Sequence, residues 1–337
     1  MSTYSLLADL PLEIESCALR GLDLDVAAGW KRRTTVVRLR RGGEEGLGED
    51  ISYDGDVQLA RQAARPVSGL AGDHTLDSFS QLLGELVPDG YERWAYESAA
   101  LDLSLRQAGI SLAEALEREP QPVSFVVSMG LGRPPSTARL VALLESRPGT
   151  RFKLDPTSVW DAKLTGQVAA LGVVDTLDFK GILRGDFGEP ADPKLYRRIA
   201  EAFPGAWLED PNLTDPEADE ALVPFRDRIT WDAAIHSTSD IDELPFPPQT
   251  LNFKPSRFGS VGALFDAYDY CAERGIGIYG GGQFELGPGR GQIQYLASLF
   301  HPSAANDVAP AGYNEVQPAA DLPRSPLLPP PVRAGFR

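Results

Sequence analysis

The sequence contains few residues of the types that build disulfide frameworks or nitrogen and sulfur metal sites. Its 337 residues include only two cysteines and three histidines. Cys17 and Cys271 lie far apart and form no paired-cysteine motif, so we expect two reduced structural thiols. The three histidines are too scattered to form a ligand set. Neither residue type therefore predicts a metal site.

Long apolar runs and basic clusters are also missing. No apolar run reaches the roughly 18 residues of a membrane span, and the N-terminal stretch lacks a basic region and a cleavage site, so we expect a cytoplasmic protein without a membrane partner. The 48 acidic residues outnumber the 32 basic ones, for a formal net charge of −16. No lysine or arginine block could follow a phosphate backbone, so we expect no nucleic-acid partner. An anionic substrate would need a local positive group, such as a metal ion.

The 42% of hydrophobic residues can form a large core. From Val123 onward, short β-rich runs alternate with amphipathic stretches such as ARLVALLES and PKLYRRIAEAF, which is the pattern of βα units around a parallel sheet. Seven or eight such units within about 190 residues favour a (β/α) barrel over an open doubly wound sheet. The candidate strands are 124–129, 151–154, 174–179, 206–208, 228–231, 250–253 and 277–279.

The residues before Val123 follow a different pattern. The strand-like runs LEIESCAL and TTVVRLRR lead into GLGEDISY, and helices are expected over 76–86 and 91–108. We therefore predict an α+β domain over 1–120, a barrel over 121–315 and a Pro-rich tail over 316–337. The prolines of PRSPLLPPPVRAGFR predict an extended wrap or a disordered end for this tail.

Polar residues at the ends of the predicted strands are the candidates for chemistry, because active sites of barrels lie at the C-terminal ends of the strands. Three successive strands each supply a carboxylate, and the next supplies Lys254: the carboxylates are Asp178, Glu209 and Asp232. Taken singly, each could be a solvated charge at a strand end. Together in a water-excluded barrel mouth, the three carboxylates would repel each other unless they are protonated or bound to a hard cation. Oxygen ligands favour Mg²⁺ or Mn²⁺.

Side chains alternate along a strand, which predicts the neighbours of these residues. Lys153 and Asp155 should share a face, as should Asp178 and Lys180. By the same rule, Asp210 should point away from Glu209.

In these residues the chain resembles the enolase superfamily, of the mandelate racemase and muconate-lactonizing enzyme type. The branch concerned holds muconate-lactonizing enzymes, dipeptide epimerases and o-succinylbenzoate synthases. Four stretches carry the resemblance: VVRLRRGGEEGLGE, AYESAALDLSLRQAGISLAEAL, NFKPSRFGSVGAL and FELGPGRGQ. The resemblance implies a modified TIM barrel with an N-terminal α+β capping domain. It also implies Mg²⁺ on Asp178, Glu209 and Asp232, with Lys254 as an acid or base.

The reaction that the resemblance implies is removal of the α-proton of a small carboxylate substrate through an Mg-stabilised enediolate. Elimination, cycloisomerisation or epimerisation can follow, in a possible homo-oligomer. Two loops, 21–33 and 50–57, are expected to close over the pocket, so Trp30 and Tyr53 are candidate substrate contacts. Asp155 and Glu285 are further candidates for substrate binding.

The chain departs from the family pattern on the second barrel strand. The family usually has Lys-x-Lys there, whereas this chain has Lys153-Leu154-Asp155. Lys180 stands where the family more often has asparagine, and it is either a replacement base or an ion-pair partner of Asp155. Lys153, Lys180 and Lys254 are thus the candidate catalytic residues, and Lys254 alone would favour a lyase or cycloisomerase over an epimerase. The alternatives are a Schiff-base aldolase that uses Lys254 and a catalytically retired binding protein.

Overall fold

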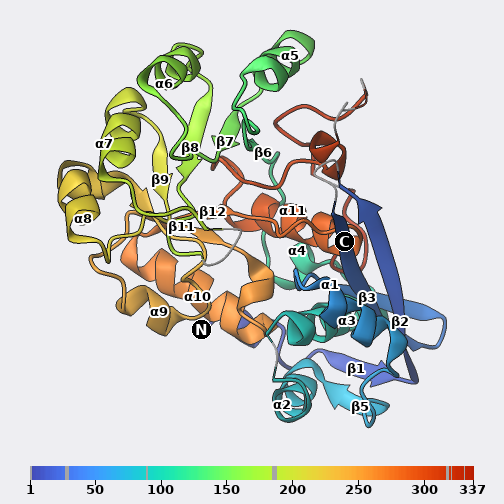
Figure 1. The fold of residues 1–337 in the computed structure, drawn as a ribbon. Coiled ribbons are helices and arrows are strands. Elements are labelled where there is room, and N and C mark those ends of the chain that lie inside the picture. The colour runs from blue at the N-terminus through green and yellow to red at the C-terminus, as the bar shows by residue number, and fades with distance from the viewer. Residues whose placement is uncertain are drawn as a thin grey trace.

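The structure is a computed structural model that describes residues 2–26, 30–88, 90–183, 188–315, 319, 321–329 and 331–337. Parallel strands surrounded by helices form a barrel, and an antiparallel unit packs against one side of it (Figure 1). We call this second unit, with its helices, the capping unit; it comprises β1–β5 and α1–α4. The fold class predicted from the sequence is confirmed, and the boundaries at 120 and 315 stay predictions.

All seven predicted barrel strands are present. Five form one hydrogen-bonded sheet in the order β10-β9-β8-β7-β6, and β11 pairs with β12. Asn252 N donates to Trp231 O over 3.0 Å and so joins β11 to the end of β10. The strands are β6 (Val127–Met129), β7 (Phe152–Leu154), β8 (Val174–Asp178), β9 (Trp207–Glu209), β10 (Ile229–Thr230), β11 (Thr250–Phe253) and β12 (Gly277–Gly280).

The eighth position of the barrel is filled by a segment that the sequence pattern did not predict. Asn306 forms a parallel bridge with Phe125, and Asp307 forms one with Gly281. These contacts close the barrel between β12 and β6. The segment is too short and too polar to be recognised as a strand from its hydrophobic pattern.

The predicted stretches ARLVALLES and PKLYRRIAEAF form α5 and α7. The helices described in the barrel are α5 (Ala138–Ser146), α6 (Ala162–Ala169), α7 (Pro193–Ala202), α8 (Pro216–Leu222), α9 (Thr238–Asp242), α10 (Val261–Arg274) and α11 (Pro288–Phe300). Gly275 ends α10 with a φ of 68°, the left-handed conformation that glycine adopts readily at the end of a helix. Their inner faces bury leucine, isoleucine and aromatic side chains against the strands.

The capping unit contains a three-stranded antiparallel sheet in the order β2-β3-β4. Its elements are β1 (Pro11–Ile14), β2 (Ser16–Asp25), β3 (Lys31–Arg41), β4 (Glu44–Asp50), α1 (Gly55–Ala63), β5 (Gly72–Thr75), α2 (Leu76–Leu86), α3 (Gly90–Ala108) and α4 (Leu112–Ala115). A Cβ on Gly46 would lie 2.1 Å from Ala99 O, and one on Gly48 would lie 1.9 Å from Ala95 O. The glycines of GLGE therefore allow β4 to lie directly on α3.

Buried charges join the capping unit to the barrel. The Glu49 carboxylate accepts hydrogen bonds from Leu286 N over 2.7 Å and Gly289 N over 2.9 Å, at the start of α11. Arg32, on β3, donates to Gln283 O over 2.9 Å and to Phe284 O over 3.2 Å. Both anchors end on the glycine-rich stretch after β12.

The described part of the tail is an extended wrap. Leu327 pairs with Val123, and Phe336 is buried on the capping unit, where its N–H donates to Asp102 over 2.8 Å. This agrees with the extended alternative for the Pro-rich end.

Both cysteines are free thiols, and burial raises the pKa of each to about 12, as expected for reduced structural residues. Across the described ranges, no helix combines the length and apolar character needed to cross a membrane.

Candidate active site

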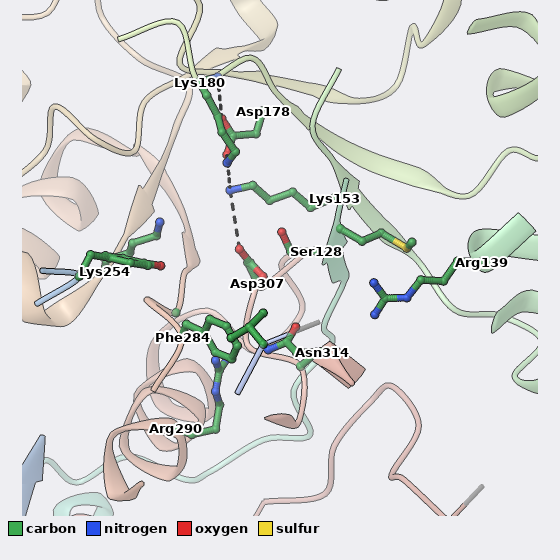
Figure 2. A pocket seen from close by; sticks show the side chains of 15 residues that line it. Ser128, Arg139, Lys153, Asp178, Lys180, Lys254, Phe284, Arg290, Asp307 and Asn314 are labelled. Atoms are coloured by element: carbon green, nitrogen blue, oxygen red, sulfur yellow. Dashed lines mark hydrogen bonds and ion pairs between the residues drawn. The ribbon is translucent and has the colours of Figure 1, made fainter. Parts of the chain in front are cut away.

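The predicted site residues come from the C-terminal ends of neighbouring barrel strands. Lys153 lies on β7, Asp178 ends β8 and Glu209 ends β9. The parallel register places Asp178 directly beside Glu209. Asp232 lies two residues after the end of β10, and Lys254 directly follows β11. The barrel thus brings together the charged residues collected from the sequence, of which Figure 2 shows Lys153, Asp178, Lys180 and Lys254.

Lys153 lies at the centre of the carboxylates, with only 2% of its side chain exposed. Its Nζ contacts Glu209 Oε1 and lies 3.4 Å from Asp178 Oδ2 and 3.7 Å from Asp307 Oδ2. Burial by itself would lower the pKa of Lys153, but the carboxylates of Glu209 and Asp178 outweigh it and hold the pKa well above its usual value. Lys153 is therefore the internal cation of this cluster.

Lys180 pairs with two carboxylates at the edge of the cluster. Its Nζ lies 2.7 Å from Asp178 Oδ2 and 3.4 Å from Asp155 Oδ1. Burial would raise the pKa of Asp178, but Lys180 and Lys153 lower it to about 2. Lys180 adopts a φ of 51°, so the backbone after β8 is no longer a strand. The contact with Asp155 is the one expected for the ion-pair alternative.

Asp210 departs from the expected alternation. Ligand oxygens of Asp178, Glu209 and Asp210 all lie within 4.8 Å of one another. The prediction that Asp210 points away from Glu209 is therefore wrong, because its φ of 48° turns the chain out of the extended conformation. The Asp210 oxygens accept hydrogen bonds from Asp232 N over 2.8 Å and Ala233 N over 2.9 Å.

Asp232 forms the other side of the cluster, bound by two cations. Lys254 Nζ lies 2.7 Å from its Oδ2, and Arg257 Nη1 lies 2.7 Å from its Oδ1. Burial opposes ionisation of this carboxyl, but Arg257 and Lys254 outweigh it and hold the pKa of Asp232 far below its usual value. Arg257 extends from the turn after β11, and the sequence analysis did not select it.

The cluster suits a hard divalent cation. Burial raises the pKa of Glu209 to about 8 and that of Asp210 to about 7, with the neighbouring carboxylates adding to both shifts. The carboxyls of Glu209 and Asp210 would therefore be stabilised in their charged form by a further cation. Oxygen ligands this close together fit a metal ion of the Mg²⁺, Mn²⁺ or Ca²⁺ type.

A cavity of about 280 Å³ opens beside the cluster. Lys153, Lys180 and Lys254 all line it, together with Asp178 and Asp307. Figure 2 shows Lys254 and Arg139 on opposite sides of this space. We call it the catalytic cavity.

The four predicted substrate-binding residues are Tyr53, Trp30, Asp155 and Glu285, and of these Tyr53 is in the described lining of the catalytic cavity. Tyr53 lines it, below the guanidinium of Arg32 at 4.3 Å. Trp30 instead packs edge-on against Phe284, with ring centroids 6.1 Å apart, and Phe284 lines the cavity. Asp155 lines a neighbouring cavity, which shares Asp178 and Lys180 with the catalytic cavity.

Glu285 pairs with Arg290, which lines the catalytic cavity, over 3.0 Å. Glu285 Oε1 also accepts from Gln283 N over 2.7 Å. Its place is therefore behind the cavity wall. The predicted loop 21–33 is described except for 27–29, and its described parts continue β2 and β3.

Sequence reasoning missed several residues of the site. Asp307 lies on the short eighth strand, which carries no hydrophobic pattern. Arg32 lies within the predicted loop 21–33, from which only Trp30 was selected, and Glu49 lies just before the predicted loop 50–57, from which only Tyr53 was selected. Glu49 lies inside the GLGE stretch, so a buried acid after two glycines was an available signal.

Comparison with known proteins identifies the class. An o-succinylbenzoate synthase from Geobacillus stearothermophilus is 23% identical to the chain over 334 residues, which cover 90% of this chain and 86% of that protein. The fold matches a dipeptide epimerase from Methylococcus capsulatus with a TM-score of 0.74 at 16% identity, over 91% and 92% of the two chains. An enolase-superfamily member from Listeria innocua matches with a TM-score of 0.71 at 17% identity, over 89% and 86%.

The fold, the acidic cluster and these relatives define an enzyme of the enolase superfamily, in the branch predicted from the sequence. Within it, the chain belongs to the family described as a domain of unknown function, DUF8230. Residues 5–115 match its N-terminal domain, and residues 119–315 match its C-terminal domain.

Proposed function

We propose that the chain removes the α-proton of a carboxylate substrate with Lys254 as the base, in a metal-dependent elimination. One observation carries this proposal: Lys254 lines the catalytic cavity while its Nζ lies 2.7 Å from Asp232, at the edge of the carboxylate cluster. The o-succinylbenzoate synthase relatives support it, and formation of o-succinylbenzoate is the first specific product to assay.

We infer that the metal is Mg²⁺, with Mn²⁺ as a substitute, and that its ligands are Asp178, Glu209 and Asp232. The dipeptide epimerase of similar fold contains an Mg ion. Asp210 is the other acid of the cluster, but both of its oxygens already accept backbone N–H groups. Its proposed role is to hold the turn that carries Asp232. When bound, the cation would orient the substrate carboxylate and stabilise the negative charge that develops as the proton leaves.

The protein's own residues position the base. Asp232 holds the Lys254 ammonium at the cavity wall, and Arg257 binds the other oxygen of the same carboxylate. Only 12% of the Lys254 side chain is exposed, so bulk water has little access to the transferred proton. Lys254 in its neutral form would accept the α-proton and could return it to the leaving group.

The number of available bases favours elimination or cycloisomerisation over epimerisation. A second base would have to face Lys254 across the substrate, and Asp155 occupies the second-strand position of the family lysine. Lys180 pairs with Asp178 and Asp155 through one ammonium group. We propose that Lys180 is an ion-pair partner that supports this wall of the cavity.

Proton exchange in D₂O tests the central proposal. Wild-type protein is incubated with a set of carboxylates, with Mg²⁺ or with EDTA, and loss of the α-proton is followed by NMR. We expect exchange that requires Mg²⁺ and falls by about a thousandfold in Lys254→Ala, within the usual range for a general base. Lys163→Ala, an exposed lysine on α6, is the matched control. Exchange that persists in EDTA or in Lys254→Ala would refute the proposal.

The same assay separates the roles of Lys180. For an ion-pair partner, Lys180→Met should lower turnover by less than about tenfold. A loss as large as that of Lys254→Ala would instead make Lys180 a second base and restore epimerisation. Trapping by borohydride without a metal requirement would favour the Schiff-base alternative.

A further inference from the structure

Glu209 is the most enclosed of the three proposed metal ligands. It is 0% exposed, against 4% for Asp178 and 5% for Asp232. It is not among the described residues that line the catalytic cavity, whereas Lys153, which contacts it, is. The Glu209 carboxylate therefore lies behind Lys153, inside the barrel. Its neighbours in the barrel interior decide which of its oxygens can reach a metal ion at the mouth.

The two oxygens of Glu209 have different partners. Oε1 contacts Lys153 Nζ, which also lies 3.4 Å from Asp178 Oδ2 (Figure 2). Oε2 instead accepts a hydrogen bond from the hydroxyl of Tyr279. Asn252 Nδ2 lies 3.3 Å from Oε1 and 3.4 Å from Oε2, so it does not distinguish between them. One oxygen thus faces a flexible cation beside the cavity, and the other faces a phenol in the barrel interior.

Tyr279 is fixed in the barrel wall. It lies on β12, where the parallel register places it beside Asn252 of β11, and it is buried. A phenol has one proton to donate, and Tyr279 gives it to Glu209 Oε2. If Oε2 turned towards a metal ion, a buried hydroxyl would be left without its acceptor, which costs free energy. The bond to Tyr279 therefore opposes rotation of the carboxylate.

Mg²⁺ and Ca²⁺ make different demands on such a carboxylate. Ca²⁺ takes about six to eight oxygens in flexible geometry and often uses both oxygens of one carboxylate. Mg²⁺ requires a nearly ideal octahedron, and the two oxygens of one carboxylate are too close together to fill two of its corners without strain. A glutamate that offers Oε1 alone therefore suits Mg²⁺, whereas one that is free to offer both oxygens suits Ca²⁺.

We propose that Tyr279 is a positioning residue that makes the site selective for Mg²⁺ over Ca²⁺, because it holds Oε2 of Glu209 away from the metal ion. This role rests on the proposed function, since it takes Glu209 to be a ligand. Oε1 remains available, because its partner Lys153 is a flexible side chain that can give way to the ion. Tyr279 acts through Glu209 alone and is not in the described lining of the catalytic cavity.

Metal affinities of Tyr279→Phe test this role, because the variant removes only the hydroxyl. The full chain, freed of metal with a chelator, is titrated with Mg²⁺ and separately with Ca²⁺ in the absence of substrate, and both dissociation constants are measured by calorimetry. We expect Mg²⁺ binding to weaken by about tenfold, at the low end of the range for a group behind a metal ligand. Ca²⁺ binding should stay the same or tighten, so the ratio of the two constants should shift towards Ca²⁺ by about tenfold or more.

Three further variants locate the effect. Tyr279→Leu also lacks the hydroxyl and should show the same shift in the ratio. Tyr268→Phe is the matched control, because it removes another buried tyrosine hydroxyl, whose partner is His301 Nε2 at 3.1 Å. It should keep the wild-type ratio. Asn252→Ala removes the donor that lies near both oxygens of Glu209, so it should weaken the binding of both ions to a similar extent.

The proposal is overturned by an unchanged ratio in both Tyr279 variants, by an equal shift in Tyr268→Phe or Asn252→Ala, or by a wild type that binds neither ion or prefers Ca²⁺. Proton exchange separates this result from the proposed function. If no carboxylate exchanges its α-proton but the ratio shifts in Tyr279→Phe, the proposed reaction fails and the positioning role stands. If exchange requires Mg²⁺ but the ratio does not shift, the reaction stands and the role of Tyr279 fails.

Discussion

The capping unit and the barrel mouth both bury charges, but they satisfy them differently. Glu49 and Arg32 end on backbone N–H and C=O groups, whose positions are set by the fold. Lys153, Asp178 and Glu209 end on one another's side chains. A backbone partner is part of the fold itself, whereas a lysine side chain among carboxylates can move aside for a metal ion. A buried charge held by backbone groups is therefore a structural anchor, whereas a buried charge held by other charged side chains can form part of a binding site.

The largest effect should follow from removal of the internal cation. Lys153→Met leaves Glu209 and Asp178 without their central partner, so we expect the free energy of unfolding in EDTA to fall by about 3–5 kcal/mol. Mg²⁺ should restore much of this loss, because it supplies the missing positive charge. Urea unfolding with and without Mg²⁺ measures both effects. Equal stability of Lys153→Met and Lys163→Met in EDTA would contradict the role of Lys153 as the internal cation of the carboxylate cluster.

His301 is a buried imidazole that contacts Asn306, where the barrel closes, and its neutral form is favoured there. Its Nδ1 lies 2.7 Å from Asn306 Oδ1, and burial lowers its pKa to about 4. Between the unfolded pKa of about 6.5 and pH 4, the unfolded chain binds more protons than the folded one. This contribution to stability is therefore complete above about pH 6.5 and falls by on the order of 3 kcal/mol by pH 4.

The pH dependence is measured by urea unfolding, with His301→Gln as the variant and the exposed His236→Gln as the control. We expect the difference between the wild type and His301→Gln to shrink as the pH falls. A difference that is independent of pH would contradict the assignment.

Mg²⁺ should stabilise the protein against unfolding through the carboxylates at the barrel mouth. Substitutions outside this cluster should leave the gain unchanged. With Mg²⁺ at a hundred times its dissociation constant, the wild type should gain about 2.7 kcal/mol. Asp178→Asn should lose this gain. Asp175→Asn is a matched control, because Asp175 lies on the same strand but pairs with Arg151 outside the cluster. A gain that survives in Asp178→Asn would remove this residue from the ligand set.

The smallest effect is expected at the anchor of the capping unit. Glu49→Gln keeps one acceptor oxygen but turns an NH₂ group toward backbone N–H donors, which should cost about 1–2 kcal/mol in thermal or urea unfolding. Mg²⁺ should not rescue this variant. Glu45→Gln, on the same strand but partly exposed, should cost about 0.5 kcal/mol. Rescue of Glu49→Gln by Mg²⁺ would show that the two regions are not independent.

Much of the fold could be predicted because its signals are local. Seven barrel strands have short β-rich runs, and α5, α7 and α10 have clear helical periodicity. The charged residues of the mouth were found because each directly follows such a run. The eighth strand at Asn306 and Asp307 was missed because it is held by bridges to distant segments and has no pattern of its own.

The predicted alternation failed where the backbone leaves the strand. Asp210 adopts a left-handed conformation, at a φ of 48°, directly after β9. A period of two residues cannot describe a side chain beyond the last extended residue. For this reason Asp210 joined the cluster from which the sequence had excluded it.

The sequence by itself determined the barrel, the order of its strands along the chain, and the acids and lysines that end them, because hydrophobic periodicity and strand ends are local properties. Only the tertiary structure decided which charges meet. The pairing of Lys180 with Asp155, the position of Lys153 among three carboxylates, and the anchoring of α11 by Glu49 all join residues that lie on different elements. Such contacts depend on strand register and on packing between elements, which no local pattern encodes.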